Sequence, residues 1–74
     1  MTELAARILT ALAQQDGQPL ARLRKQLDVA MSELLRNLSA LEALHLTERR
    51  EQARRDCVFL TDKGRALMQS GEQP

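Results

Sequence analysis

Two clusters of basic side chains are the best candidates for a binding function in this chain, because guanidinium and ammonium groups are suited to binding phosphates. The clusters comprise Arg22, Arg24 and Lys25, and then Arg49, Arg50, Arg54, Arg55, Lys63 and Arg65. Residues 26–48 lie between them and hold Asp28, Glu33, Glu42 and Glu48 against Arg36, a local charge of −3 (1 minus 4). A phosphate-binding surface is therefore expected to draw its charge from two separate parts of the chain.

Residue types needed for catalysis or metal binding are sparse. Cys57 is the single cysteine, which excludes an internal disulfide and a multi-cysteine metal site, and the single histidine, His45, has no carboxylate cluster around it. We expect a plain strand position for Cys57, with a redox or nucleophilic role as the alternative, and a cap or surface position for His45, with a pH switch or metal ligand as the alternative. Neither enzymatic activity nor a cofactor is expected.

The length of 74 residues allows one domain, and 43% hydrophobic but only 1% aromatic residues predict an aliphatic core built mainly from leucine. The prediction is a single domain over residues 1–74, with residues 68–74 as a frayed tail. A domain of this size buries only about 60% of the surface of its unfolded chain, so we expect a homodimer. No run approaches the ~18 apolar residues of a membrane span and no secretion signal is recognisable, so a cytoplasmic location without a membrane is expected.

Apolar spacing predicts three helices before His45. The first covers residues 3–15, with Thr2 as N-cap and Asp16-Gly17 as its end. Pro19 predicts a short extended step over residues 18–20, since the residue before proline is pushed out of helical geometry. A short amphipathic helix follows over residues 21–27, then a tight turn over 28–30. The third helix covers residues 31–44 and is expected to turn inward a row of leucines, namely Leu34, Leu38, Leu41 and, as a further candidate, Leu44.

The pattern after His45 changes from helical to alternating. Thr47 lies between Leu46 and Glu48, and Val58 and Leu60 alternate with Cys57 and Phe59, which predicts two antiparallel strands. The joining segment, about residues 51–55, has no Asn-Gly or Asp-Gly turn signal, so a loose hairpin tip is expected. Phe59 is expected either to face a partner or to pack on the first helix or the tail. A last helix, capped by Thr61 or Asp62, is predicted through Met68.

This order of elements resembles the winged helix-turn-helix domain of bacterial MarR-type and ArsR-type transcription regulators over residues 5–68. The resemblance rests on a closing motif of the form Leu-Thr-x-x-Gly-x-x-Leu, present here as Leu60, Thr61, Gly64 and Leu67. It rests further on leucines near the end of the recognition helix, Leu38, Leu41 and Leu46. It implies a mainly α fold with a small β-hairpin: a three-helix core, a two-stranded wing and a C-terminal helix. In this motif Leu60 and Leu67 would face the core, Thr61 would cap the last helix, and Gly64 would allow close backbone approach.

The resemblance also implies a function. In that family the second helix of the helix-turn-helix enters the major groove of double-stranded DNA, and wing arginines reach phosphates or the adjacent minor groove. The implied activity is sequence-specific DNA binding by a small transcription regulator without a dedicated small-molecule pocket. Residues suited to a base edge or phosphate on the recognition helix are Ser32, Arg36 and Asn37. Residues suited to backbone phosphates are Arg22, Arg24, Lys25, Arg49, Arg50, Arg54 and Arg55. For each arginine, a solvated face or an ion pair with Glu48, Glu51 or Asp56 is the alternative.

Three residues depart from the family pattern. Glu33 places a negative charge at the groove-facing start of the recognition helix, and Leu35 places a large apolar group where a small or polar residue is usual. His45 stands where the family commonly has glycine, which leaves room for a different helix cap. The alternative function is therefore a winged-helix protein-protein interaction module that docks a protein partner on the Leu35 face. A dimer of so short a chain would have to use the first helix, the last helix or the exposed strand face.

Overall fold

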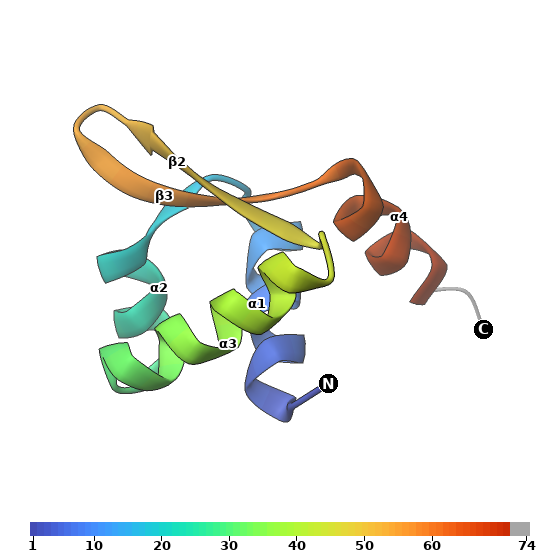
Figure 1. Ribbon diagram of the computed structural model, residues 1–74, viewed down its shortest axis with the longest axis horizontal. Helices are drawn as coiled ribbons and strands as arrows, with labels where there is room; N and C mark the ends of the chain where they lie inside the picture. Colours follow the sequence, from blue (N-terminus) through green and yellow to red (C-terminus); the bar gives the residue numbers. More distant parts are fainter. Residues whose placement is uncertain (72–74) are drawn as a thin grey trace.

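The computed structural model describes residues 1–71, which fold into four helices and three strands (Figure 1). In chain order they are α1 (Glu3–Gln14), β1 (Gln18–Pro19), α2 (Leu20–Leu27), α3 (Met31–Ala43), β2 (Thr47–Gln52), β3 (Arg55–Leu60) and α4 (Asp62–Gly71). The strands form one antiparallel sheet in the order β1-β3-β2. This arrangement confirms the predicted winged helix-turn-helix fold, and the extended step before α2 proves to be a third strand that pairs with β3.

The core is aliphatic, as predicted, and lies between the helices and the inner face of the sheet. Its fully buried side chains include Ile8, Leu9 and Leu12 of α1, Leu23 of α2, Leu34, Leu38 and Leu41 of α3, and Val58 of β3. Two leucines predicted to face inward are exposed instead: Leu44 by 50% and Leu67 by 42%. Leu44 follows the last residue of α3, and in α4 Met68 packs against the core in place of Leu67.

The start of α1 is capped as predicted, and its end is held by the side chain of Gln18 in β1. The Thr2 hydroxyl accepts the Ala5 N–H at 3.0 Å, which satisfies one of the orphan amides of the first turn. The buried Gln18 amide donates to the carbonyls of Ala11 at 3.1 Å and Gln15 at 2.8 Å. These bonds fix β1, and therefore the start of α2, against the end of α1.

The end of α3 is a left-handed cap of the kind that glycine usually provides. His45 has φ 60°. Its N–H donates to the Glu42 carbonyl at 2.9 Å, and the Leu46 N–H donates to the Leu41 carbonyl at 3.0 Å. This is the hydrogen-bond pattern of a Schellman motif, in which buried apolar residues such as Leu41 and Leu46 commonly pack together. The glycine-like cap is thus kept, although the residue is histidine.

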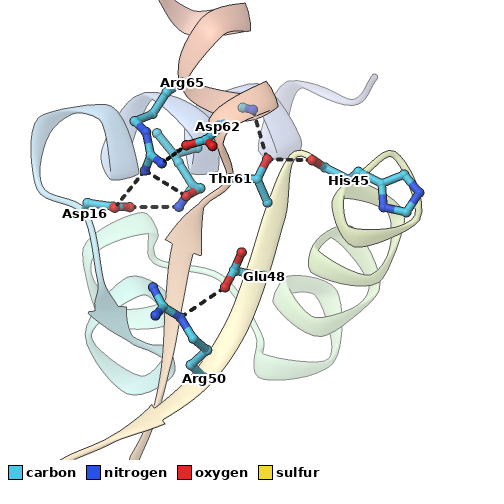
Figure 2. Close-up of polar contacts among 9 residues, drawn as sticks. Asp16, His45, Glu48, Arg50, Thr61, Asp62 and Arg65 are labelled. Carbon is cyan, nitrogen blue, oxygen red and sulfur yellow. Dashed lines mark hydrogen bonds and ion pairs between the residues drawn. The ribbon is translucent and has the colours of Figure 1, made fainter.

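The closing motif joins α4 to this cap (Figure 2). The Thr61 hydroxyl accepts the Gly64 N–H at 3.0 Å and donates to the His45 carbonyl at 2.6 Å, while the Thr61 N–H donates to the Leu46 carbonyl at 3.1 Å. A Cβ on Gly64 would lie 2.1 Å from the Leu46 carbonyl oxygen. The roles predicted for Leu60, Thr61 and Gly64 are therefore confirmed, with Leu60 buried.

Phe59 packs within its own chain. Its ring lies so close to Gly17 that a Cβ there would come within 2.6 Å of it, and the Arg50 guanidinium lies 4.0 Å from the ring centroid. Cys57, as predicted, is a buried strand residue with a free thiol. Helix α4 continues to Gly71, beyond the predicted end at Met68, and the remainder of the predicted tail, 72–74, lies outside the described residues.

None of the helices within residues 1–71 is long and apolar enough to cross a membrane.

Replacing Gly64 with alanine should destabilise the fold. At an exposed helical site this change would stabilise by about 1 kcal/mol, because alanine has the higher helix propensity. Here the Cβ meets backbone, so we expect a loss of about 2 kcal/mol or more and a melting temperature lower by about 4–8 °C for each kcal/mol. The melting temperatures of the variant and the wild type are measured by thermal unfolding, with circular dichroism as the signal. A melting temperature equal to or above that of the wild type would contradict the close contact.

Candidate nucleic-acid interface

The outer face of α3 presents a short polar ridge. Leu34, Leu38 and Leu41 bury one side of the helix, so residues on the opposite side project into solvent. Ser32, Arg36 and Ser39, at spacings of four and three, all lie on that exposed side. Arg36 makes no ion pair with another described residue. The structure thus brings the predicted Ser32 and Arg36 together on one face.

Asn37 lies apart from this ridge. Its side-chain oxygen accepts the Thr2 hydroxyl, and its amide nitrogen donates to the Glu33 carbonyl at 2.9 Å. The side chain is half-buried against the start of α1. The sequence placed Asn37 among the DNA-contacting residues, and in the structure its hydrogen bonds connect α3 to the start of α1.

Leu35 is half-buried on the flank of α3 that faces the wing. It lies two turns before Glu42, whose carboxylate reaches the wing, and so shares that flank. The large apolar side chains that are exposed, among those the structure describes, are Met1, Leu44 and Leu67. A docking face centred on Leu35 therefore lacks the exposed leucine that the alternative function required. Glu33 is exposed in the first turn of α3, as predicted.

The wing is a tight hairpin and not the loose loop that the sequence predicted. Strand β2 pairs with β3 from Thr47 opposite Leu60 to Gln52 opposite Arg55. The two residues between the strands, Ala53 and Arg54, have φ 52° and 63°, the positive values of a type I′ turn. Asn-Gly is the usual pair at such a turn, and the prediction of a loose tip was wrong because it relied on the absence of that pair. The tip exposes Arg54 and Arg55, neither of which pairs with an acid among residues 1–71.

Two other wing arginines are engaged inside the chain. Arg49 holds Glu42 of α3 through both carboxylate oxygens, with its Nε 2.7 Å and a terminal nitrogen 3.2 Å from them. The Arg50 Nε lies 3.0 Å from a Glu48 carboxylate oxygen (Figure 2). The Arg50 guanidinium also lies over the Phe59 ring. Neighbouring strand residues point to opposite faces, so one arginine meets the recognition helix and the other meets the far face of β3. Arg50 thus makes one of the ion pairs considered as the alternative, with Glu48, whereas the partner of Arg49, Glu42, was not among the acids considered.

Two further basic residues hold the base of α4 in place. Asp16 accepts the Leu60 N–H at 2.8 Å, and Arg65 donates to the Leu60 carbonyl at 3.0 Å. Arg65 also pairs with Asp62 and lies 3.7 Å from Asp16 (Figure 2). Lys63 donates to the Leu44 carbonyl at 3.1 Å. The second basic cluster of the sequence therefore leaves only its two tip arginines uncommitted within the described part of the chain.

The cations of α2 are exposed, and one of them meets the wing. Arg22, Arg24 and Lys25 lie on the solvent side of α2, and Arg22 lines a hollow of about 430 Å³ that is open to solvent. The other residues that line it are Pro19, Leu20, Ala21, Met31, Arg55 and Asp56. The fold thus brings Arg22 and Arg55 to one depression. The apolar residues of this hollow could not be predicted from the sequence, because no local pattern shows that α2, α3 and β3 meet there.

The chain is similar to known proteins in both sequence and structure. Residues 1–64 match the model of a family described as winged helix DNA-binding domain. Similar solved structures include a MarR family transcriptional regulator from Silicibacter pomeroyi, at 32% identity over 95% of this chain and 49% of that one, with a TM-score of 0.84. No curated protein matches the sequence significantly.

Two further solved structures show the same likeness. A variant of MepR from a Staphylococcus aureus clinical isolate is 26% identical over 100% of this chain and 57% of that one, with a TM-score of 0.89. Reduced AbfR bound to DNA is 25% identical over 95% of this chain and 55% of that one, with a TM-score of 0.85. The chain therefore spans about half the length of these structures.

Replacing Ala53 with asparagine should stabilise the wing without touching its arginines. A left-handed backbone costs an ordinary residue roughly 1–2 kcal/mol, and asparagine, the preferred first residue of a type I′ turn, avoids part of that cost. We expect a gain of about 0.5 kcal/mol in the free energy of unfolding, measured by urea denaturation. The matched control, Ala66→Asn on the exposed side of α4, should lose about 0.5 kcal/mol. A loss at both positions would contradict the turn.

Proposed function

Because the chain belongs to the winged helix DNA-binding domain family, we propose that it binds double-stranded DNA sequence-specifically, as a small transcription regulator. The observation that carries this proposal is the placement of the exposed cations that form no ion pair with another described residue. They come from all three elements that approach DNA in such domains: Arg22, Arg24 and Lys25 of α2, Arg36 of α3, and Arg54 and Arg55 of the wing tip. AbfR, whose structure is similar, was solved bound to DNA.

Base contacts and phosphate contacts come from different elements in this proposal. Helix α3 enters the major groove, where Ser32 and Arg36 meet base edges. Glu33 in its first turn repels phosphates, so α3 adds little net attraction. Helix α2 and the wing tip therefore supply most of the affinity through phosphates, and binding depends steeply on salt.

Arg49 and Arg50, the two wing arginines that form ion pairs within the chain, act as positioning residues. Arg49 joins β2 to α3 through Glu42, and Arg50 braces β3 through Phe59. Their charges are largely offset within the chain, so they set the angle between wing and recognition helix and contribute little to phosphate binding. The sequence assigned all four wing arginines to phosphates, whereas this proposal assigns only Arg54 and Arg55 to them.

We also propose a homodimer on a two-fold DNA site. The exposed apolar side chains Met1, Leu44 and Leu67 come from the start of the chain, the end of α3 and α4. Figure 1 shows α4 at the opposite end of the molecule from the wing tip. A dimer joined there would leave both wings and both recognition helices accessible, and its two helices would read half-sites about one helical turn apart.

Removing the tip arginines should weaken DNA binding on every sequence. For Arg54→Ala/Arg55→Ala with a mixed-sequence duplex, the slope of log affinity against log salt should fall by roughly two units, about 0.9 for each lost phosphate contact. Fluorescence anisotropy at several salt concentrations measures the slope. Amide shifts of the wild type on titration should include Ser32, Arg36 and residues 49–55. If none of these shifts even at low salt, the DNA-binding proposal is wrong.

The matched control is Glu42→Gln/Arg49→Gln. This variant leaves the net charge unchanged and removes only the ion pair between wing and α3. We expect its salt slope to equal that of the wild type, because Arg49 is not among the phosphate contacts. A fall of a full unit would move Arg49 into the contact set.

The dimer is tested by sedimentation equilibrium of the whole chain. The wild type should sediment as a dimer, and Leu44→Gln/Leu67→Gln should shift the equilibrium towards the monomer by more than tenfold, roughly the effect of losing two partly buried leucines from an interface. Both residues are exposed in the single chain, so its melting temperature at low concentration should change little. A wild type that stays monomeric at high concentration would rule out the dimer.

A further inference from the structure

We propose that the hollow between α2, α3 and β3 seats one strand of the DNA sugar-phosphate backbone, the strand that separates the major groove from the minor groove. The hollow has a volume of about 430 Å³ and opens to solvent beside the wing. This inference rests on the proposed function and adds to it a defined backbone seat. It predicts which residues, apart from the cations, determine affinity.

The position of the hollow follows from the groove geometry. If α3 occupies the major groove and the wing tip the adjacent minor groove, one backbone strand must pass between them. The surface between them is this hollow, with Met31 from the first turn of α3 on one side and Arg55 and Asp56 of β3 on the other. A continuous ridge at this place would hold the backbone away and prevent simultaneous engagement of both grooves.

The lining suits a sugar-phosphate chain. Arg22 and Arg55 stand on two different elements around the hollow, so they can hold phosphates on either side of a deoxyribose. Pro19, Leu20 and Met31 give it apolar surface for the C–H groups of that sugar. The first turn of α2 also borders it, and its N-cap, Pro19, supplies no side-chain acceptor to the amides there. Those amides add a partial positive charge.

Asp56 is the one acidic residue that lines the hollow. It is exposed and makes no ion pair with another described residue, so its charge is not offset within the chain. A carboxylate beside a phosphate weakens binding by Coulomb repulsion. In this proposal Asp56 limits the affinity and speeds release of DNA.

The test fills the hollow without changing any charge. Ala21 lines it, is exposed and is helical, so Ala21→Leu adds bulk and keeps a strong helix former. Ala66→Leu, on the exposed side of α4, is the matched control. Both variants and the wild type are titrated with the same mixed-sequence duplex over a range of salt concentrations, and circular dichroism confirms the fold of each.

We expect Ala21→Leu to lose about tenfold or more in affinity and to lower the salt slope by up to roughly two units, because the backbone is pushed away from Arg22 and Arg55. A lower salt slope without removal of a cation is the signature of the backbone seat. Ala66→Leu should bind like the wild type. If Ala21→Leu also binds within about twofold of the wild type, the backbone does not enter the hollow. That result would leave the DNA-binding proposal intact. A wild type that does not bind the duplex would contradict both the DNA-binding proposal and the backbone seat.

A second variant tests the same seat from the opposite direction. Asp56→Asn should bind the duplex several-fold more tightly, since the repulsion of the phosphate is gone. Glu3→Gln, an equal charge change on the exposed start of α1, should have no comparable effect beyond the general change in net charge. Equal affinities for the two variants would place Asp56 outside the backbone path and overturn the proposal.

Discussion

The approach of Gly64 to the Leu46 carbonyl is the constraint on which the rest of the structure depends. Three elements meet there: the cap of α3 at His45, the residue before β2, and the first turn of α4. The Thr61 hydroxyl bonds to both the cap and α4. A side chain at position 64 would separate them, since 2.1 Å leaves no room for a carbon atom. The recognition helix and the wing are thus fixed relative to each other at their common base.

The wing is anchored at its base and supported progressively less towards its tip. Near the base, Val58 and Leu60 are buried, and Asp16 and Arg65 hold the backbone of Leu60. Further out, the support is the half-exposed ion pair between Arg49 and Glu42, and such pairs contribute only about 0.2–1 kcal/mol. The tip beyond it has exposed side chains only. The tip is therefore the part of the wing most able to adjust to a groove of variable width.

The sequence predicted the helices, the N-caps of α1 and α4, and the roles of Leu60, Thr61 and Gly64 in the closing motif, because these depend on residues close together in the chain. It did not predict the tight wing turn, since the pairing of β2 with β3 overrides the poor turn preference of Ala53 and Arg54. Nor could it assign the wing arginines. Arg49 and Arg50 look equivalent in sequence, yet strand alternation sends one to Glu42 and the other to Phe59. The inward position of Met68 in place of Leu67 likewise depends on how α4 leaves the sheet.

The distribution of charge separates affinity from specificity. Most of the cations without an ion pair among the described residues lie on α2 and at the wing tip. In the proposed complex these elements face phosphates, which are the same in every sequence. The recognition helix offers few groups that discriminate between bases, and a good bidentate contact such as one from Arg36 contributes only about 1–3 kcal/mol. A single domain would therefore bind many sequences with similar affinity. In the proposed dimer, pairing two domains would double the number of discriminating contacts and fix the spacing of their half-sites, so specificity would depend on the dimer more than on any one side chain.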